Sequence, residues 1–191
     1  MPTIRALARA LLPGRTWEAW LAILTATFGL PLSDAELQLF ATMTGRTCAP
    51  SSTSTRIREL WCIIGRRAGK SRIAALIAIY LTCCREYTLA PGETGVFMVI
   101  GADRRQARVI KRYISGFLRA DPAFEALLAD ETADAITLTN GLVIEIHTAS
   151  YRAIRSYTLI VPHLLRFVFG CLPYGNPDAV TSTFGSCPKN Q

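Results

Sequence analysis

The stretch WCIIGRRAGKSRIAAL, residues 61–76, contains the change from strand to helix that decides the fold. Residues 60–64 form a short apolar run of the kind that builds a buried β-strand. Small and basic residues follow at 65–69, and from about Lys70 to Cys84 the chain has the apolar character of a buried helix. This order predicts a strand, a tight turn and a helix, as in an α/β domain.

The turn has the composition of a phosphate-binding loop. Such a loop needs little side-chain bulk, because backbone N–H groups must point at the anion, and it needs the partial positive charge of a helix N-terminus. A lysine then reaches the terminal phosphates, and a hydroxyl group ligates Mg²⁺. Gly69, Lys70 and Ser71 fit these three roles. We therefore predict a phosphate site here.

One glycine departs from the usual pattern of such loops, G-x-x-x-x-G-K-[ST]. Gly65 lies one position late, and Ile64 stands where the first glycine is expected. The alternative interpretation is a basic turn that caps an ordinary helix.

The composition indicates a folded chain with an anionic partner. Of its 191 residues 50% are hydrophobic and 18% are charged, and the net charge is +7, which is typical of a globular domain that binds nucleotide or nucleic acid. The six cysteines form no C-x-x-C pair and lie at no zinc-ligand spacing from the two histidines. Scattered thiols, and apolar runs too short to span a bilayer, lead us to expect a cytoplasmic protein without a membrane anchor.

Two helices are expected before the loop. Thr16 can cap a helix that runs to about Phe28, and Ser33 and Glu36 have capping-box spacing, which predicts a second helix from near Asp34. The small polar residues at 46–56 are typical of a loop. We expect the three tryptophans to be core residues.

Further strands and a helix are expected after the loop. They are a strand at 96–100, a helix from Asp103 to about Leu118, a hairpin at 135–148 around Asn140-Gly141, and a strand at 156–161. Strands that alternate with helices predict a parallel sheet flanked by helices.

The predicted helix after Asp103 separates basic from apolar residues. Its basic residues cluster on one face: Arg104, Arg105, Arg108, Lys111 and Arg112. A charged face of this kind is more commonly solvated, and the alternative is contact with DNA phosphates. Glu145, His147 and Ser150 could suggest a hydrolase, but no nucleophile-elbow motif accompanies them.

The run GRRAGKSRIAALIAIYL resembles the deviant phosphate loop of phage terminase large subunits, the ATPases that package DNA into viral capsids. The upstream WEAWLAILTATFGLPLSDAELQLFATMTGR and the downstream VFMVIGADRRQARVIKRYISGFL are also similar to that family. The resemblance covers roughly residues 15–161 and implies an incomplete P-loop NTPase fold. We therefore expect an N-terminal helical segment and loop at 1–56, a partial ATPase core at 57–161 and, where the resemblance ends, an irregular tail at 162–191.

The resemblance also implies cofactors, partners and residue roles. ATP and Mg²⁺ would be the cofactors, with Lys70 and Ser71 on phosphate and Ser71 on the metal ion. Arg66 would be the catalytic arginine that stabilises charge in the transition state. The partners would be double-stranded DNA, the terminase small subunit and the portal protein, in the cytoplasm of a bacterial host that carries a phage or prophage. The residues expected to bind ATP are Gly65, Arg66, Arg67, Ala68, Gly69, Lys70 and Ser71.

The acids that the family uses for hydrolysis are not found. In that family an apolar strand ends in Asp-Glu shortly after a segment that Arg155–Thr158 resembles, whereas the only acid here after Glu145 is Asp178. The nuclease domain of the family has no counterpart either, so we expect a truncated chain whose tail is out-of-frame or unrelated sequence. The alternative is a natural short protein that has lost hydrolysis. We expect ATP binding without hydrolysis. The alternatives are a non-catalytic nucleotide- or DNA-binding fragment and a helicase-like P-loop ATPase.

Overall fold

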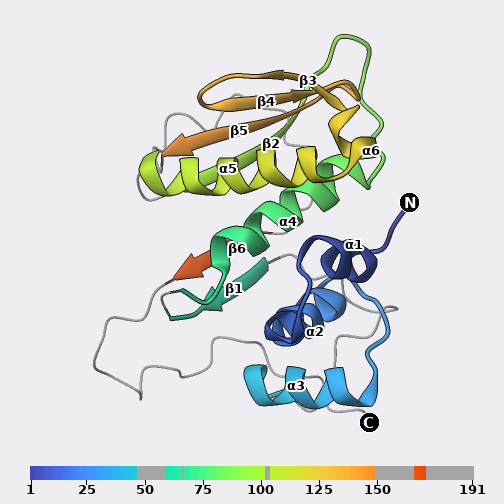
Figure 1. Ribbon diagram of the computed structural model, residues 1–191, viewed down its shortest axis with the longest axis vertical. Helices are drawn as coiled ribbons and strands as arrows, with labels where there is room; N and C mark the ends of the chain where they lie inside the picture. The colour runs from blue at the N-terminus through green and yellow to red at the C-terminus, as the bar shows by residue number, and fades with distance from the viewer. Residues whose placement is uncertain (47–58, 66, 102–103, 149–165, 171–191) are drawn as a thin grey trace.

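The computed structural model describes residues 1–46, 59–65, 67–101, 104–148 and 166–170 (Figure 1). In this part of the chain helices come first, strands and helices then alternate, and only strands follow. The helical elements are α1 (Ile4–Leu11), the 3₁₀ turn η1 (Arg15–Trp17), α2 (Glu18–Thr27), α3 (Asp34–Thr44), α4 (Lys70–Cys83), α5 (Arg104–Ala120) and α6 (Pro122–Glu125). The strands are β1 (Glu59–Ile63), β2 (Gly95–Gly101), β3 (Leu128–Glu131), β4 (Ala135–Leu138), β5 (Leu142–Thr148) and β6 (Arg166–Gly170).

The strands form two sheets, one of them mixed. The larger has the order β2-β5-β4-β3, and in it only β2 and β5 are parallel. The strands β1 and β6 form a separate parallel pair. The predicted α/β class is confirmed, but the prediction of a parallel sheet holds only in part. A short hairpin connection can join only antiparallel strands, since a parallel pair needs a crossover, and β4 and β5 are joined by such a hairpin.

The helix α4 lies at the centre of the molecule. It runs between α1 and α2 on one side and the larger sheet with α5 on the other (Figure 1). It contacts α1, α5 and β5, and every residue from Ala75 to Cys83 is buried. A helix that is apolar around its whole circumference is stable in water only when it is surrounded. Its two sides therefore join the N-terminal helices and the sheet through one core.

The N-terminal helices begin partly as predicted. Ser33 and Glu36 form the predicted capping box, and Gly45 ends α3 with a φ of 66°. The prediction that Thr16 caps α2 was wrong, because Thr16 lies within η1 and α2 begins at Glu18 without a side-chain cap. The carboxylate of Glu36 also accepts from the guanidinium of Arg5 at 2.8 Å, which fixes α1 against α3.

The predicted hairpin around Asn140-Gly141 is confirmed, and its turn is attached to α4. The loop holds residues 139–141, with Gly141 at a φ of 82°, as in a type I turn followed by a left-handed glycine. The side-chain amide of Asn140 donates to the carbonyl of Thr82 at 2.8 Å. Asn140 also accepts from the N–H of Leu142 at 3.2 Å. The turn therefore satisfies a carbonyl in the last turn of α4.

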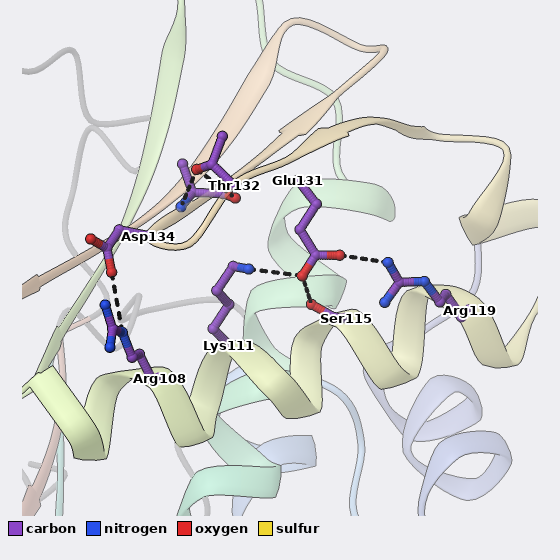
Figure 2. A network of polar contacts seen from close by, with 8 residues as sticks. Arg108, Lys111, Ser115, Arg119, Glu131, Thr132 and Asp134 are labelled. Carbon is purple, nitrogen blue, oxygen red and sulfur yellow. Dashed lines mark hydrogen bonds and ion pairs between the residues drawn. The ribbon is translucent and has the colours of Figure 1, made fainter.

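The basic face of α5 is paired with acids in and after β3 rather than fully solvated (Figure 2). Glu131 accepts from Lys111 at 2.8 Å, from Ser115 at 2.6 Å and from Arg119 at 2.7 Å. Lys111 is only 9% exposed, so the prediction of a solvated face was wrong at this residue. Asp134 pairs with Arg108 and Arg104 at 3.5 and 3.4 Å. These contacts hold the β3–β4 hairpin against α5.

Some of the predicted elements lie in parts of the chain that the structure does not describe. The predicted strand at 156–161, most of the predicted loop at 46–56 and the capping residue Asp103 lie outside the described residues. The strand β6 lies within the segment 162–191 that we expected to be irregular. Among the described residues, no helix combines the length and the apolar character that a membrane crossing requires.

The pH dependence of stability tests the contacts of Glu131. Burial raises the pKa of Glu131, but the hydrogen bonds from Lys111, Ser115 and Arg119 outweigh burial and lower it from 4.5 to about 2. A carboxylate whose pKa is lowered by folding stabilises the fold at pH values above its pKa in the unfolded chain. This stabilisation is lost as the pH falls through its pKa in the folded chain. We predict that Glu131→Gln lowers the free energy of unfolding at pH 7 by ~2 kcal/mol.

Denaturant unfolding from pH 7 to pH 2 measures this effect. The difference between the wild type and Glu131→Gln should be constant above about pH 4.5 and should shrink towards pH 2. Glu125→Gln is the control, because Glu125 is exposed at the end of α6. A difference that does not change with pH would contradict the assigned contacts.

Candidate phosphate-binding loop

The loop that carries the predicted site residues joins β1 to α4. The strand ends at Ile63, one residue before its predicted end, and the helix begins at Lys70, as the sequence predicted. Cys62 of β1 is 5% exposed, whereas the adjacent Ile63 is 55% exposed. Burial of one face fixes the register of a strand, because side chains alternate between its two faces. The fixed register of β1 therefore fixes where the loop begins relative to the N-terminus of α4.

Gly69 is required at the junction for two reasons. Its φ of 81° lies in the left-handed region, where a Cβ atom is disfavoured. A Cβ at this position would also lie 2.5 Å from Cζ3 and 2.7 Å from Cη2 of Trp17, far inside van der Waals contact. The glycine thus lets the chain turn into α4 and lets the indole of Trp17 pack directly on the backbone.

Backbone N–H groups at the start of α4 are left without acceptors in the described part of the chain. The N–H groups of Arg72 and Ile73 donate to the carbonyl of Gly69 at 3.0 and 3.1 Å. Within the described residues, no backbone acceptor lies on the N–H groups of Gly69, Lys70 or Ser71. The first N–H groups of a helix and its dipole together attract an anion. This end of α4 therefore has the donors that a phosphate group needs.

The side chain of Lys70 lies across the loop. Its Nζ donates to the carbonyls of Ile64 and Gly65 at 2.9 and 2.7 Å. The ammonium thus lies beside the end of β1 and within the same turn as the available N–H groups. A lysine has three donors, so one remains for another acceptor. The two carbonyls hold the positive charge in place without neutralising it.

The remaining predicted site residues differ in what the structure assigns to them. Ser71 is half-buried, and its hydroxyl makes no hydrogen bond to another described residue. Arg67 is exposed and has a φ of 65°, which is uncommon for a residue other than glycine. Gly65 is exposed and Ala68 is half-buried. Arg66, the predicted catalytic residue, lies outside the described residues.

Two tryptophans that the sequence analysis assigned only to the core contact this loop. The indole Nε1 of Trp20 donates to the carbonyl of Ala68 at 2.9 Å, and Trp17 packs on Gly69. Trp20 is also buried, as predicted. Trp61 was wrongly predicted as a core residue, since it is 52% exposed on β1. The spacing of three residues between these two tryptophans was the signal that they face the same side, although Trp17 lies in η1 and Trp20 in α2.

A cation–aromatic stack connects the loop to α5. The guanidinium of Arg72 lies 5.2 Å from the ring centroid of Trp17 and 5.9 Å from that of Tyr113. Contacts at this range are attractive by ~1 kcal/mol each. The first turn of α4 is therefore held from both the N-terminal segment and α5.

Ser71 is the one described site residue that suits a magnesium ion. A hydroxyl can provide one ligand, and Mg²⁺ commonly completes its shell with water and phosphate oxygens. Among the described residues, no three His, Cys, Asp or Glu side chains lie close enough to hold a metal ion. The strand next to β1 is β6, which has the sequence RFVFG, ends at Gly170 and therefore contains no acidic residue that could hold the ion. The loop therefore fits a phosphate group well and a metal ion only through Ser71.

Other reactive side chains in the described ranges give no competing site. Burial raises the pKa of Cys62 and of Cys84 to about 11, so these thiols stay protonated and unreactive at neutral pH. His147 and Glu145 form a pair at 2.7 Å along β5. Ser150, which the sequence analysis considered with them, lies outside the described residues.

Alanine substitutions of three glycines separate the two reasons for Gly69. Gly92 has a φ of 84°, and a methyl group added there would meet no atom of another described residue, whereas Gly65 has neither constraint. We predict that Gly92→Ala lowers the free energy of unfolding by ~1 kcal/mol through its backbone alone. Gly69→Ala should cost ~3 kcal/mol, because the indole of Trp17 must also move.

Denaturant unfolding of the three variants measures these costs. Gly65→Ala should change stability by at most ~1 kcal/mol. If Gly69→Ala costs no more than Gly92→Ala, the contact between Trp17 and Gly69 does not constrain the loop.

Comparisons with known proteins add no assignment to this geometry. The chain was compared with protein families, with curated proteins and with solved structures, and none of the three comparisons gave a match. The functional assignment therefore depends on the residues of the loop and on their contacts.

Proposed function

We propose that the chain binds the phosphates of ATP at the loop between β1 and α4, as the ATP-binding part of a phage terminase large subunit. One observation carries the phosphate assignment. The N–H groups of Gly69, Lys70 and Ser71 have no acceptor among the described residues, and they belong to the same loop whose Ile64 and Gly65 carbonyls hold the Lys70 ammonium, at the N-terminus of a long buried helix. The terminase assignment is supported by the resemblance of residues 15–161 to that family.

Binding would exchange weak contacts of Lys70 for stronger ones. Its Nζ now donates to two neutral carbonyl groups, those of Ile64 and Gly65. An ammonium is attracted more strongly to an ionised phosphate oxygen than to a neutral carbonyl oxygen, because the phosphate oxygen carries more negative charge. A triphosphate would therefore draw Nζ from the carbonyls, while the N–H groups at the start of α4 hold the same anion. Bound with the nucleotide, Mg²⁺ would neutralise part of the phosphate charge.

We propose further that this chain does not hydrolyse ATP by itself. Phosphoryl transfer to water needs a carboxylate or an equivalent group that orients the attacking water. After Glu145 the sequence contains one acid, Asp178. The acids Glu131 and Asp134 are paired with basic residues of α5. Arg66 could stabilise charge on a transferred phosphate, but an arginine cannot accept a proton from water.

Double-stranded DNA is a second proposed ligand, and α5 is where it would bind. Arg105 and Arg112 are exposed on α5, and the structure gives neither of them an ion pair with another described residue. Contacts of this kind with phosphates give binding that is independent of sequence and weakens with salt. The small subunit and the portal protein are proposed as partners through the family resemblance alone.

Removal of the Lys70 ammonium tests the phosphate assignment. We predict that Lys70→Ala weakens ATP binding at least about tenfold in isothermal titration calorimetry, because the strongest donor to the terminal phosphates is lost. Arg105→Ala is the control, since it removes one positive charge from an exposed position on α5. Equal affinities of the wild type and Lys70→Ala would refute the assignment.

Steady-state turnover tests the proposed lack of hydrolysis. Phosphate release by the wild-type chain with saturating ATP and Mg²⁺ should not exceed that of Lys70→Ala. Turnover of about 1 per second or faster, the range of working enzymes, that disappears in Lys70→Ala would contradict the proposal.

A further inference from the structure

The indole of Trp20 connects the N-terminal helices to the phosphate-binding loop. Trp20 lies on α2 and is 7% exposed. Its Nε1 donates to the carbonyl of Ala68 at 2.9 Å, across 48 positions of the sequence. The contact is partly buried, and a carbonyl that is shielded from water is costly when it has no donor. The contact therefore fixes the direction in which the carbonyl of Ala68 points.

The direction of this carbonyl determines the direction of the next N–H group. The chain has no cis peptide bond among its described residues. In a planar trans peptide, the C=O of one residue and the N–H of the next point in opposite directions. With the carbonyl of Ala68 held towards Trp20, the N–H of Gly69 points away from α2. That N–H has no acceptor among the described residues.

A rotated peptide would oppose phosphate binding. If the peptide between Ala68 and Gly69 turned over, a carbonyl oxygen would replace the N–H group on the side of the anion. The partial negative charge of that oxygen would repel a phosphate, whereas an N–H group attracts it. Trp17 packs on Gly69 and restricts the same peptide from the side of η1. The two tryptophans thus act on one peptide unit.

We propose that Trp20 is a positioning residue for phosphate binding: it holds the peptide between Ala68 and Gly69 so that the N–H of Gly69 faces the anion. This proposal rests on the proposed function of the loop. It also makes the N-terminal segment part of the site, because the docking of α2 and the binding of phosphate favour the same orientation of the peptide. Coupling of this kind is reciprocal.

The variant Trp20→Phe removes the indole N–H and keeps an aromatic ring in the buried position. Affinity for pyrophosphate and for ATP is measured by calorimetry at a temperature where both proteins are fully folded. We expect the affinity for both ligands to fall about three- to tenfold, the range set by one hydrogen bond. Trp61→Phe is the matched control, since its ring is half exposed on β1, and it should leave the affinity unchanged.

The outcomes separate this proposal from the proposed function. If the wild type binds neither ligand, the function fails and the role of Trp20 fails with it. A second outcome is that the wild type binds, that Lys70→Ala does not bind, and that Trp20→Phe binds as the wild type does. In that case the function stands and the role of Trp20 is refuted. A lower unfolding midpoint with unchanged affinity would likewise refute it, because Trp20 would then have only a structural role.

A measurement on the wild type avoids dependence on how well Trp20→Phe folds. Hydrogen exchange of the Trp20 indole N–H is followed by NMR with and without saturating pyrophosphate. Because coupling is reciprocal, pyrophosphate should slow this exchange about three- to tenfold, the same factor as the loss of affinity. Unchanged or faster exchange in the bound protein would overturn the proposal.

Discussion

The packing of the Trp17 indole on the backbone of Gly69 is the contact on which the candidate site depends. It sets where α4 begins, because only a glycine fits against the ring and only a left-handed residue turns the chain there. The start of α4 in turn places Lys70 across the loop and leaves its first N–H groups without acceptors among the described residues. The buried helix behind them carries this geometry into the core, where α1, α5 and β5 surround it.

The N-terminal segment therefore contributes contacts to the candidate site. Trp20 holds a loop carbonyl, Trp17 holds the loop glycine, and Arg72 lies between Trp17 and a tyrosine of α5. Each contact joins parts of the chain that are distant in sequence. A loop that is built from small residues has little packing of its own, so its shape must come from its neighbours. Here those neighbours are aromatic side chains, which provide a large contact area with few rotatable bonds.

Local signals predicted the elements that depend on local chemistry. The strand β1, the start of α4, the capping box of Ser33 and Glu36 and the turn at Asn140-Gly141 are all encoded within a few residues. The strand β3 was missed because LADE is polar and poor in β-branched residues, and the contacts of Glu131 with α5 stabilise it instead. The contacts of both tryptophans with the loop span about fifty positions of the sequence. The periodic pattern of apolar residues does not predict which residue is the partner at such a distance. The predicted roles of Lys70 and Ser71 remain predictions that their surroundings support.

We propose that phosphate binds between the N–H groups at the start of α4 and the Lys70 ammonium. A crystal structure of the chain with ATP tests it most directly. We expect the terminal phosphates to lie within hydrogen-bond distance of the N–H groups of Gly69, Lys70 and Ser71. We also expect Nζ of Lys70 to have left the carbonyls of Ile64 and Gly65 for a phosphate oxygen. ATP bound elsewhere, with Nζ still on both carbonyls, would refute this phosphate site.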